Sequence, residues 1–435
     1  MSIRSIPLLV AGALASPLLA GPSDVVIFAF TQGTNTVLRI QDLNGDGDTL
    51  DPGEVTRFMD TTFGGVLGIS NAQGLYALGP NEVLATDNFP PDNILRLRDD
   101  NTDGDAYDPG ESSVFWNGDT FGGLTLTNPT CLMRAHDGSY YTVDNNQLDT
   151  TRPEAIYRLR DLNNNGTVND PGEVELWKEL APIGSTTESS VFDVEVDAAG
   201  NAYVFDISSP ARIDRIDEAT RTRANWLTAG QLVTLRNLTL DISYKLTRNP
   251  ATDEIIAPAF NINSRLFFVA LKDLNGSNTI DQSGEIRIIW SELANADGRM
   301  GMGAPRDIFW GPDGSLLFVE SVQRRVWRLV DLNSDGDFND LGETTIAYDS
   351  NAAVAAGLPA GAQLLSVSMA LVPPPAPCLG DANGDNQIDA ADLSVLLANF
   401  GQPAAGPAFG DFNGDGQCDG ADLSVLLAQF GSTCP

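Results

Sequence analysis

A unit of about 57 residues recurs six times along this chain of 435 residues, and the repeat restricts the possible folds more than any other feature. Five copies contain a short apolar strand, a loop rich in Asp, Asn and Gly, and a closing Glu, as in VLRIQDLNGDGDTLDPGE at 37–54. The sixth copy, IDRIDEAT at 213–220, keeps the strand but lacks the loop. The acids at the loop-opening position lie 55 to 62 residues apart, at Asp42, Asp99, Asp161, Glu218, Asp273 and Asp331. Such a period is typical of repeat architectures, in which each unit buries its faces only against its neighbours.

Each repeat contains the pattern of four short antiparallel strands. Two strands joined by a tight turn, as at 191–196 and 202–205, are followed by a third strand, the loop and a fourth strand. Four such strands form one blade of a propeller. The first copy lacks its first strand, and residues 364–372 form a strand with none after it, so pairing 364–372 beside 24–30 closes the ring. The sequence therefore predicts an all-β fold, a six-bladed β-propeller over residues 22–372.

An aromatic residue recurs near the end of each fourth strand. The six residues are Phe58, Trp116, Trp177, Trp226, Trp290 and Tyr348. They either fill the gaps between blades or form a ring on which a ligand stacks. Packing between blades is the commoner use of large aromatic side chains on an outer strand.

The blade pattern, seen clearly at 197–206 and 311–320, resembles six-bladed propellers of the NHL and strictosidine-synthase/gluconolactonase type. The resemblance spans about residues 22–372 and implies the fold. Gluconolactonase-type propellers hold a central metal with Glu, Asn and Asp side chains. Polar residues that follow apolar strands at similar repeat positions are Asp87, Asn88, Asp144, Asn145, Asp206 and Glu320. Asp144, Asp206 and Glu320 are the catalytic candidates, at one mouth of the channel; the alternative is that they end strands in turns.

The repeated loops carry the ligand pattern of a calcium site. In the loop that begins at Asp42, oxygen-bearing side chains stand at positions 1, 3, 5 and 7, Gly stands at position 6 and Glu at position 13. Calcium takes about six to eight oxygen ligands, and Gly permits the sharp turn. An EF-hand loop is one residue shorter and joins two helices, whereas these loops join strands. They therefore resemble an EF-hand only in the type and spacing of their ligands.

Five loops share this pattern, and recurrence at one place in five repeats favours calcium over the alternative that Asp, Asn and Gly merely form turns. The predicted ligands are Asp42, Asn44, Asp46, Asp48 and Glu54; Asp99, Asn101, Asp103, Asp105 and Glu111; Asp161, Asn163, Asn165 and Glu173; Asp273, Asn275, Ser277 and Glu285; and Asp331, Asn333, Asp335, Asp337 and Glu343. The loops are numbered by their repeat, so the fifth loop is the one that begins at Asp273. The third and fifth loops, at Asp161 and Asp273, have fewer charges, so we expect them to bind calcium more weakly.

A Pro-rich linker, residues 373–377, precedes a distinct module at 378–435. The module contains two near-identical units in which a loop runs into an apolar helix. Its predicted calcium ligands, at positions 1, 3, 5, 9 and 12, are Asp381, Asn383, Asp385, Asp389 and Asp392, and Asp411, Asn413, Asp415, Asp419 and Asp422. Position 7 is Gln in both loops, which is compatible because this position contributes its backbone carbonyl.

The paired loop–helix units resemble a type I dockerin. The resemblance implies calcium (Ca2+) binding and a cohesin-like or cell-surface protein as partner. Dockerins usually carry hydroxyl residues at loop positions 10 and 11 and a basic residue on the helix that grip a cohesin. Here those positions are Ala390/Ala391 and Gly420/Ala421, and the helices have no Lys or Arg. Calcium binding carries over from the resemblance, but the usual cohesin contacts do not.

The N-terminus predicts export. A short basic start and an apolar run ending in small residues indicate a signal peptide of residues 1–20, cleaved after Ala15 or Ala20. A membrane anchor is the alternative, although the run is short for a span. No other segment is long and apolar enough to cross a bilayer.

Export permits disulfides, and Cys378 and Cys434 bracket the C-terminal module, so we expect them to pair. Cys131 and Cys418 are expected to stay reduced and buried. The formal charge of −34, from 59 acidic and 25 basic residues, argues against nucleic acid or an anionic membrane as a partner.

The only histidine, His136, falls in a predicted turn, so no Ser-His-Asp, Cys-His or zinc-type cluster can be assembled. The sequence therefore favours an extracellular binding or scaffold protein whose propeller recognises a carbohydrate or protein ligand and whose C-terminal module attaches it to a partner. The alternative is an extracellular hydrolase, of lactonase or glycoside-cleaving type, because dockerin modules usually accompany polysaccharide-degrading enzymes. A pair of carboxylates for glycoside hydrolysis is compatible with so acidic a chain.

Overall fold

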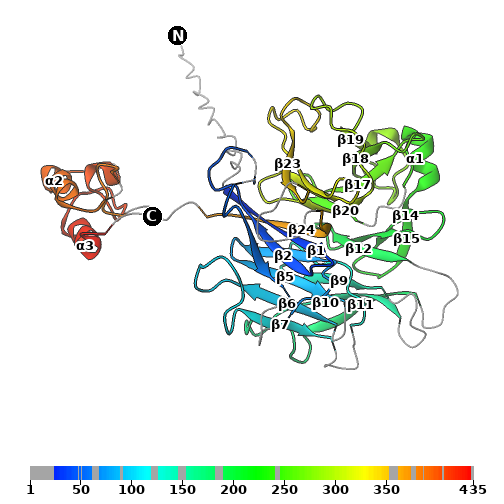
Figure 1. Cartoon of the computed structure of the whole chain (residues 1–435), viewed down its shortest axis with the longest axis horizontal. Coiled ribbons are helices and arrows are strands. Elements are labelled where there is room, and N and C mark those ends of the chain that lie inside the picture. Colours follow the sequence, from blue (N-terminus) through cyan, green and yellow to red (C-terminus); the bar gives the residue numbers. More distant parts are fainter. Residues whose placement is uncertain are drawn as a thin grey trace, which may run out of the picture. The chain divides into compact units, whose positions relative to one another are not determined.

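The computed structural model describes residues 24–47, 49, 51–60, 68–88, 92–118, 126–145, 153–181, 190–240, 245–351, 361–373, 379–385, 387–403 and 406–432. The chain divides into two compact units, Met1–Val372 and Pro373–Pro435. Strands are the main secondary structure of the first unit, and two helices are the main secondary structure of the second (Figure 1). The predicted signal peptide and most of the predicted linker lie outside the described residues.

The first unit is a six-bladed β-propeller, as the repeat predicted (Figure 1). Each blade is an antiparallel sheet of four strands. From the innermost strand outward, the first three blades contain β24 (Gln363–Leu371), β1 (Val25–Gln32), β2 (Thr36–Ile40) and β3 (Val55–Met59); β4 (Leu75–Gly79), β5 (Glu82–Asp87), β6 (Asn93–Arg98) and β7 (Ser112–Asn117); and β8 (Met133–Arg134), β9 (Tyr140–Asp144), β10 (Glu154–Leu159) and β11 (Val174–Ala181). The other three contain β12 (Val191–Val196), β13 (Ala202–Asp206), β14 (Arg212–Ile216) and β15 (Arg223–Thr228); β16 (Thr247–Asn249), β17 (Glu254–Phe260), β18 (Leu266–Leu271) and β19 (Ile286–Ser291); and β20 (Pro305–Trp310), β21 (Leu316–Glu320), β22 (Arg325–Leu329) and β23 (Thr344–Asp349).

The ring is closed by pairing the two ends of the propeller sequence. β24 lies antiparallel to β1, in a register that runs from Val25↔Leu371 to Gln32↔Gln363. The first blade therefore takes its innermost strand from the C-terminal end of the unit and its other three strands from the N-terminal end. This confirms the predicted pairing, and it covers an edge that each partner strand would otherwise expose.

The apolar core lies in the seams between blades. Six clusters of buried side chains each join two neighbouring blades around the ring. Between the sixth and first blades, for example, Leu317 and Val319 of β21 pack with Leu364 and Val367 of β24. Because successive side chains of a strand point to opposite faces, each blade contributes one face to each of its two seams.

The recurring aromatic residues of the fourth strands belong to these seams. Trp116 packs edge-on against Tyr157 of the next blade, with ring centroids 5.3 Å apart. Its five counterparts, Phe58, Trp177, Trp226, Trp290 and Tyr348, are buried as well. The structure therefore supports packing between blades, and not an exposed ring for ligand stacking.

Each outer strand carries a β-bulge at the same place. In β3, Arg57 and Met59 oppose Leu38 and Val37, so that Phe58 between them has no partner in the ladder. The bulged residues at this place are Phe58, Phe115, Trp177, Trp226, Ile289 and Ala347. β11 has a second bulge, at Leu180. Backbone groups at a bulge need hydrogen-bond partners outside their own sheet.

Within the described part of the predicted all-β unit there is one α-helix, and a short 3-10 helix at Ser283–Glu285. α1 (Ala229–Arg236) follows β15 directly. Thr228 caps it, because its side chain accepts a hydrogen bond from the backbone N of Gln231 at 3.2 Å, and the Gln231 side chain accepts one from the backbone N of Thr228 at 2.8 Å. Thr-x-x-Gln is a capping box, which marks the start of a helix and which the prediction of strands did not take into account. Leu232 buries the helix against the fourth and fifth blades.

In the second unit, α2 (Ala390–Asn399) and α3 (Gly420–Gln429) each follow one of the two predicted calcium loops. Both helices begin at an Asp N-cap, Asp389 or Asp419. The core of this unit includes Ile388, Leu396, Phe412, Cys418 and Leu426. Across the part of the chain that the structure describes, no helix has the length and apolar character of a membrane span.

Candidate calcium loops and the central cavity

The five propeller loops share one backbone feature and two hydrogen bonds. Position 6 is left-handed in all five, with φ between 62° and 100°, which explains the recurring Gly and the Asn278 of the fifth loop. The amide of position 6 donates to the first Asp of the loop, as Gly104 N does to Asp99 Oδ2 at 3.0 Å. The amide of position 5 donates to the Asn at position 3, as Asp103 N does to Asn101 Oδ1 at 2.9 Å. The other four loops contain the same two bonds.

The closing Glu holds each loop together from within. In the second loop, Glu111 accepts hydrogen bonds from Asp100 N and Asp108 N, both at 2.9 Å. The closing acids of the other loops are buried and accept the same two kinds of hydrogen bond, at 2.8–3.1 Å. They are Glu54, Glu173, Glu285 and Glu343. Each carboxylate oxygen has two acceptor sites, so these bonds leave it able to bind a cation.

The sequence reasoning missed one acid in each loop. In the second loop, Asn101 Nδ2 donates to Asp103 Oδ2 at 3.0 Å and to Asp108 Oδ2 at 2.6 Å, so three side chains meet. The equivalent acids, at position 10 or at position 9 in the fifth loop, are Asp51, Asp108, Asp170, Asp281 and Asp340. The signal that could have revealed them is the Asp that recurs three or four residues before each closing Glu.

The donor set of these loops fits calcium in its chemistry. All the side chains carry hard oxygen donors, which suit calcium better than a softer metal. Burial raises the pKa of Asp105, and the charges of Asp103, Glu111 and Asp108 raise it further. Asp48 lies outside the described residues. Within the described residues, no three His, Cys, Asp or Glu side chains lie close enough together to hold one ion.

The two loops of the C-terminal unit contain the same hydrogen bonds. Asn383 accepts from Asp385 N, and Asn413 from Asp415 N, both at 2.9 Å. The closing acids of these loops accept from position 2: Ala382 N donates to Asp392 and Phe412 N to Asp422, both at 2.8 Å. The first acids, Asp381 and Asp411, accept from Gly384 N and Gly414 N. All seven loops therefore share the bond to the third residue and the bond to the closing acid.

The three catalytic candidates end the second strands of three different blades. Each carboxylate accepts a backbone amide from the segment that enters its own blade: Asn128 N donates to Asp144 at 2.6 Å, Ser190 N to Asp206 at 3.2 Å and Gly303 N to Glu320 at 2.8 Å. All three are buried. Asp87 makes the same kind of contact with Ser70 N at 3.2 Å. These are the contacts of strand-ending turns, and none of the three candidates is among the residues that line the central cavity described below.

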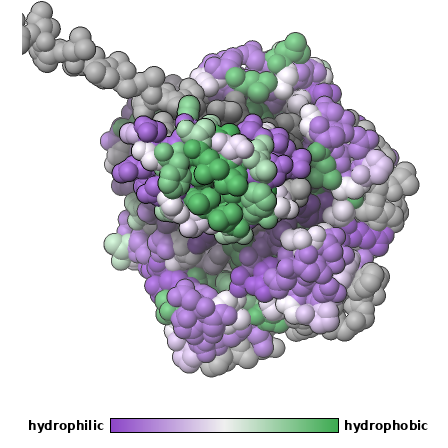
Figure 2. All heavy atoms as spheres, turned by 90° about the vertical axis from the view of Figure 1, so that its left-hand side faces the viewer, coloured by the Kyte–Doolittle hydropathy of each residue, from purple (hydrophilic) through white to green (hydrophobic). Residues whose placement is uncertain are grey.

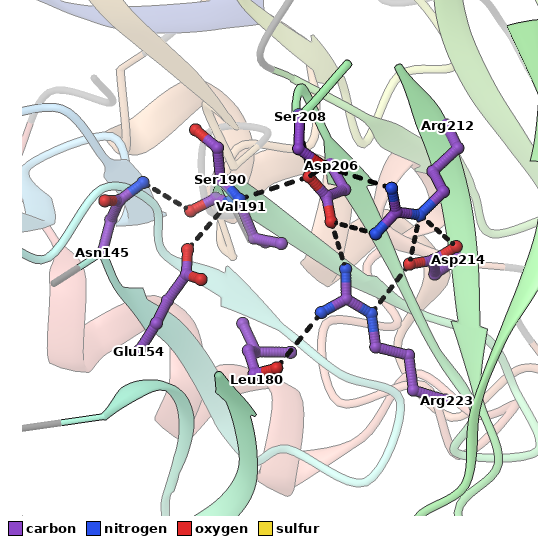
Figure 3. Close-up of polar contacts among 10 residues, drawn as sticks. All are labelled: Asn145, Glu154, Leu180, Ser190, Val191, Asp206, Ser208, Arg212, Asp214 and Arg223. Atoms are coloured by element: carbon purple, nitrogen blue, oxygen red, sulfur yellow. Dashed lines mark hydrogen bonds and ion pairs between the residues drawn. The ribbon is translucent and has the colours of Figure 1, made fainter. Parts of the chain in front are cut away.

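Asp206 has further partners that hold it in its charged form. Figure 3 shows it between two arginines, with Arg212 Nη2 at 2.6 Å and Arg223 Nη2 at 2.5 Å. Burial alone would raise the pKa of Asp206, but hydrogen bonds from Ser208 and the charges of the two arginines hold it below its usual value. Arg223 also donates to Asp214 at 2.7 Å and to the carbonyl of Leu180, in the preceding blade, at 3.4 Å. The cluster therefore joins the third and fourth blades.

The innermost strands enclose a cavity of about 480 Å³. Its charged lining residues are Arg134, Asp193, Glu195, Lys245, Arg248 and Asp307, and its aromatic ones are Tyr76, Phe309 and Trp310. Lys245 is buried at the end where the inner strands begin, and its Nζ donates to the carbonyls of Thr130 at 2.7 Å and Gln73 at 3.1 Å. The sequence did not predict this site, because the predicted candidates end the second strands of the blades, whereas Asp193, Glu195 and Asp307 lie on innermost strands.

The acids of the cavity have raised pKa values. Burial raises the pKa of Asp307 to about 7, against the attraction of the Lys245 ammonium. Burial also raises the pKa of Asp193 and, to well above its usual range, that of Glu195. For Lys245, burial lowers the pKa but the charges of Asp307 and Asp193 outweigh it, so that the amine stays protonated. The cavity therefore combines the buried Lys245 ammonium with carboxyl groups that keep a proton at higher pH than usual.

The structure describes two of the four cysteines. Cys131 and Cys418 are free and buried, as expected. Burial raises the pKa of the Cys131 thiol well above its usual value, which makes it unreactive. Cys378 and Cys434, the predicted disulfide, lie outside the described residues.

Together, these features define a six-bladed β-propeller joined to a type I dockerin domain. The type I dockerin family matches residues 379–430, in agreement with the predicted resemblance. Dockerins of this type bind calcium and cohesins, and they are typical of extracellular cellulosome components. No curated protein matches the chain.

Several solved structures are similar to the chain. A chain of a nidogen/laminin complex is 13% identical, covers 80% of this chain and 99% of its own length, and has a TM-score of 0.47. A putative 6-phosphogluconolactonase from Bacteroides uniformis is 11% identical, with the same two coverages and a TM-score of 0.44. A gluconolactonase from Xanthomonas campestris is 12% identical, covers 75% of this chain and 86% of its own, and has a TM-score of 0.39.

Proposed function

We propose that this chain is an exported, calcium-binding β-propeller that acts as an extracellular binding protein and is attached to a partner through its dockerin domain. The observation that carries the proposal is the hydrogen-bond pattern common to all seven loops. In each, the third residue accepts the amide of position 5 and the closing acid accepts the amide of position 2. Type I dockerin loops bind calcium, so the same arrangement supports calcium in the propeller loops.

Counting bound calcium by native mass spectrometry of the full chain tests this proposal. We expect three tight propeller sites, two weaker ones in the third and fifth loops, and two sites in the dockerin domain. Asp99→Asn should remove one propeller site, because Asp99 opens a strong loop. Asp217→Asn is the matched control, since Asp217 lies in the tight turn of the fourth blade, which has no loop. Only two bound ions, with no change in Asp99→Asn, would contradict the propeller sites.

The attachment surface is proposed on the two dockerin helices. Leu397, Phe400, Leu427 and Phe430 stand at matching positions of the two repeats, and their side chains are 46–58% exposed. Figure 2 shows the apolar area on this unit. Because the usual hydroxyl pair of each loop is replaced by Ala or Gly, we propose a partner of cohesin type that offers an apolar contact. Leu397→Asp combined with Leu427→Asp should abolish capture of a cohesin from a panel, whereas either change alone should leave one repeat able to bind.

A second candidate function is an extracellular hydrolase of lactonase or glycoside-cleaving type. The observation that favours it is the group of cavity acids with raised pKa values, since a carboxyl group that keeps its proton near neutral pH can act as a general acid. A turnover screen of the full chain with lactones and polysaccharides tests it. Turnover that is lost in Glu195→Gln but kept in Glu320→Gln would establish this function, and binding without turnover would exclude it for the ligands screened.

A further inference from the structure

Each of the five predicted calcium loops contacts the outer strand of the preceding blade, always through its eighth residue. In the second loop, the backbone N of Ala106 donates to the carbonyl of Phe58 at 2.8 Å. The same 2.8 Å bond joins Val168 to Phe115, Ile280 to Trp226 and Phe338 to Ile289. In the first loop, the Thr49 hydroxyl donates to the carbonyl of Ala347 at 2.8 Å, from the first blade to the sixth. All five position-8 residues are buried.

The acceptor is the bulged residue of the outer strand in every case. Phe58, Phe115, Trp226, Ile289 and Ala347 are the residues that the ladders leave without a partner. A bulge therefore leaves a carbonyl available at each seam, and the next blade's loop supplies the donor. We refer to these five contacts as the inter-blade latches.

The sixth seam, between the third and fourth blades, is built differently. The fourth blade has a tight turn at residues 217–222 in place of a calcium loop. The bulged Trp177 donates through its indole Nε1 to Glu218 at 3.1 Å, and the Arg221 guanidinium lies 4.1 Å from the centroid of its ring system. Farther along this seam, the carbonyl of Leu180 accepts from Arg223, within the Asp206 cluster of Figure 3. Ionic side chains thus replace the missing loop.

We propose that calcium closes the propeller by fixing the five latches, while the seam between the third and fourth blades is held by ion pairs and is independent of calcium. This inference rests on the proposed calcium binding of the propeller loops. Position 8 lies between the predicted ligands of positions 1 to 7 and the acid at position 9 or 10, so a cation bound by both sides fixes its backbone. Calcium then stabilises contacts between blades more than the blades themselves.

Hydrogen exchange of the full chain, in calcium and in excess chelator, tests the proposal directly. The latch amides of Ala106, Val168, Ile280 and Phe338 are themselves the probes. Val191 is the internal control, because its amide crosses the seam between the third and fourth blades to Glu154 Oε1 at 2.8 Å and is buried. We expect chelation to speed exchange at the four latch amides by at least tenfold and to leave Val191 unchanged. Equal loss of protection at Val191, or no loss at the latches, would overturn the proposal.

A conservative variant tests one latch without touching a predicted ligand. Thr49→Val removes the hydroxyl that bonds to Ala347 and keeps the shape of the side chain. Thr345→Val is the matched control, because the Thr345 hydroxyl donates to the carbonyl of Arg328 within the sixth blade at 3.2 Å. The rise in melting temperature that calcium produces should be smaller in Thr49→Val and unchanged in Thr345→Val. An unchanged rise in Thr49→Val would contradict the latch.

Native mass spectrometry of the same samples separates this inference from the proposed function. If the propeller takes up no calcium, both fail. If calcium binds but the latch amides and Val191 respond alike, the inference alone fails. If Thr49→Val keeps the wild-type number of bound ions and loses part of the calcium-dependent rise in melting temperature, both stand.

Discussion

The Nζ atom of Lys245 donates a 2.7 Å hydrogen bond to the backbone carbonyl of Thr130, which joins the fifth blade to the third across the central cavity. A second bond, of 3.1 Å, reaches the carbonyl of Gln73 at the start of the second blade, and Asp307 Oδ1 of the sixth blade lies 3.9 Å away. One buried side chain therefore links four blades. The six seams join neighbours around the ring, whereas this lysine joins blades across it.

Lys245→Met should lower the free energy of unfolding by about 3–5 kcal/mol, because it leaves Asp307 and two carbonyls buried without their cationic partner. Denaturant unfolding in saturating calcium measures the change. Lys272→Met is the control, since Lys272 is exposed and bonds to the carbonyl of Thr252 within its own blade at 2.6 Å; its cost should stay within about 0.5 kcal/mol. Equal costs for the two variants would argue against a structural role for Lys245.

Asp307 should make stability depend on pH. Its pKa is about 7 in the folded protein against an ordinary value of 3.8, so the folded state binds the proton more tightly. The stability that Asp307 contributes by binding this proton is therefore complete below pH 3.8 and is lost as the pH rises to about 7. The side chain introduced by Asp307→Asn cannot titrate. The free energy of unfolding of this variant should therefore rise steadily, relative to that of the wild type, as the pH increases over this range. Urea unfolding at several pH values checks this, and parallel curves for the two proteins would refute the assignment.

The ring could be predicted from the sequence because its evidence is local and repeated. The period located each blade. The lack of a first strand before 24–30, together with an extra strand at 364–372, required the closure that β24 and β1 form. Lys245 could not be predicted, because its partners lie 115 and 172 residues away. A buried cation bound by distant carbonyls leaves no pattern in sequence spacing.

The candidate sites were predicted unevenly for a similar reason. The loops and their shared hydrogen bonds could be anticipated, because all the predicted ligands of a loop lie within 13 residues. Asp206 is a catalytic candidate by sequence because it ends an apolar strand. The partners that hold it in its charged form, Arg212 and Arg223, come from the next two strands of its blade. A strand pattern shows which residues share a face, and it does not show which charges meet at the end of a sheet.

Asp422→Asn should remove one calcium ion from the dockerin domain and lower the stability of that domain alone. Asp422 closes the second loop by accepting from Phe412 N and Asp419 N, and it is buried at the start of α3. The two compact units of the chain should melt separately, so the propeller transition in calorimetry should not move. Ser424→Ala, on the exposed face of α3, serves as the control. A shift of the propeller transition in Asp422→Asn would contradict the independence of the units.

Arg223→Lys should weaken the seam between the third and fourth blades by about 1–3 kcal/mol, even in saturating calcium. Arg223 reaches Asp206, Asp214 and the carbonyl of Leu180 with three different nitrogens, and a single ammonium cannot replace that planar fork. Arg98→Lys is the matched control, because Arg98 pairs with Asp100 on the exposed surface, where the cost should stay within about 0.5 kcal/mol. Denaturant unfolding measures both variants, and hydrogen exchange at Val191 reports the seam itself. If Arg223→Lys left Val191 protected and lost no more stability than Arg98→Lys, the ion pairs of this seam would not be what holds it closed.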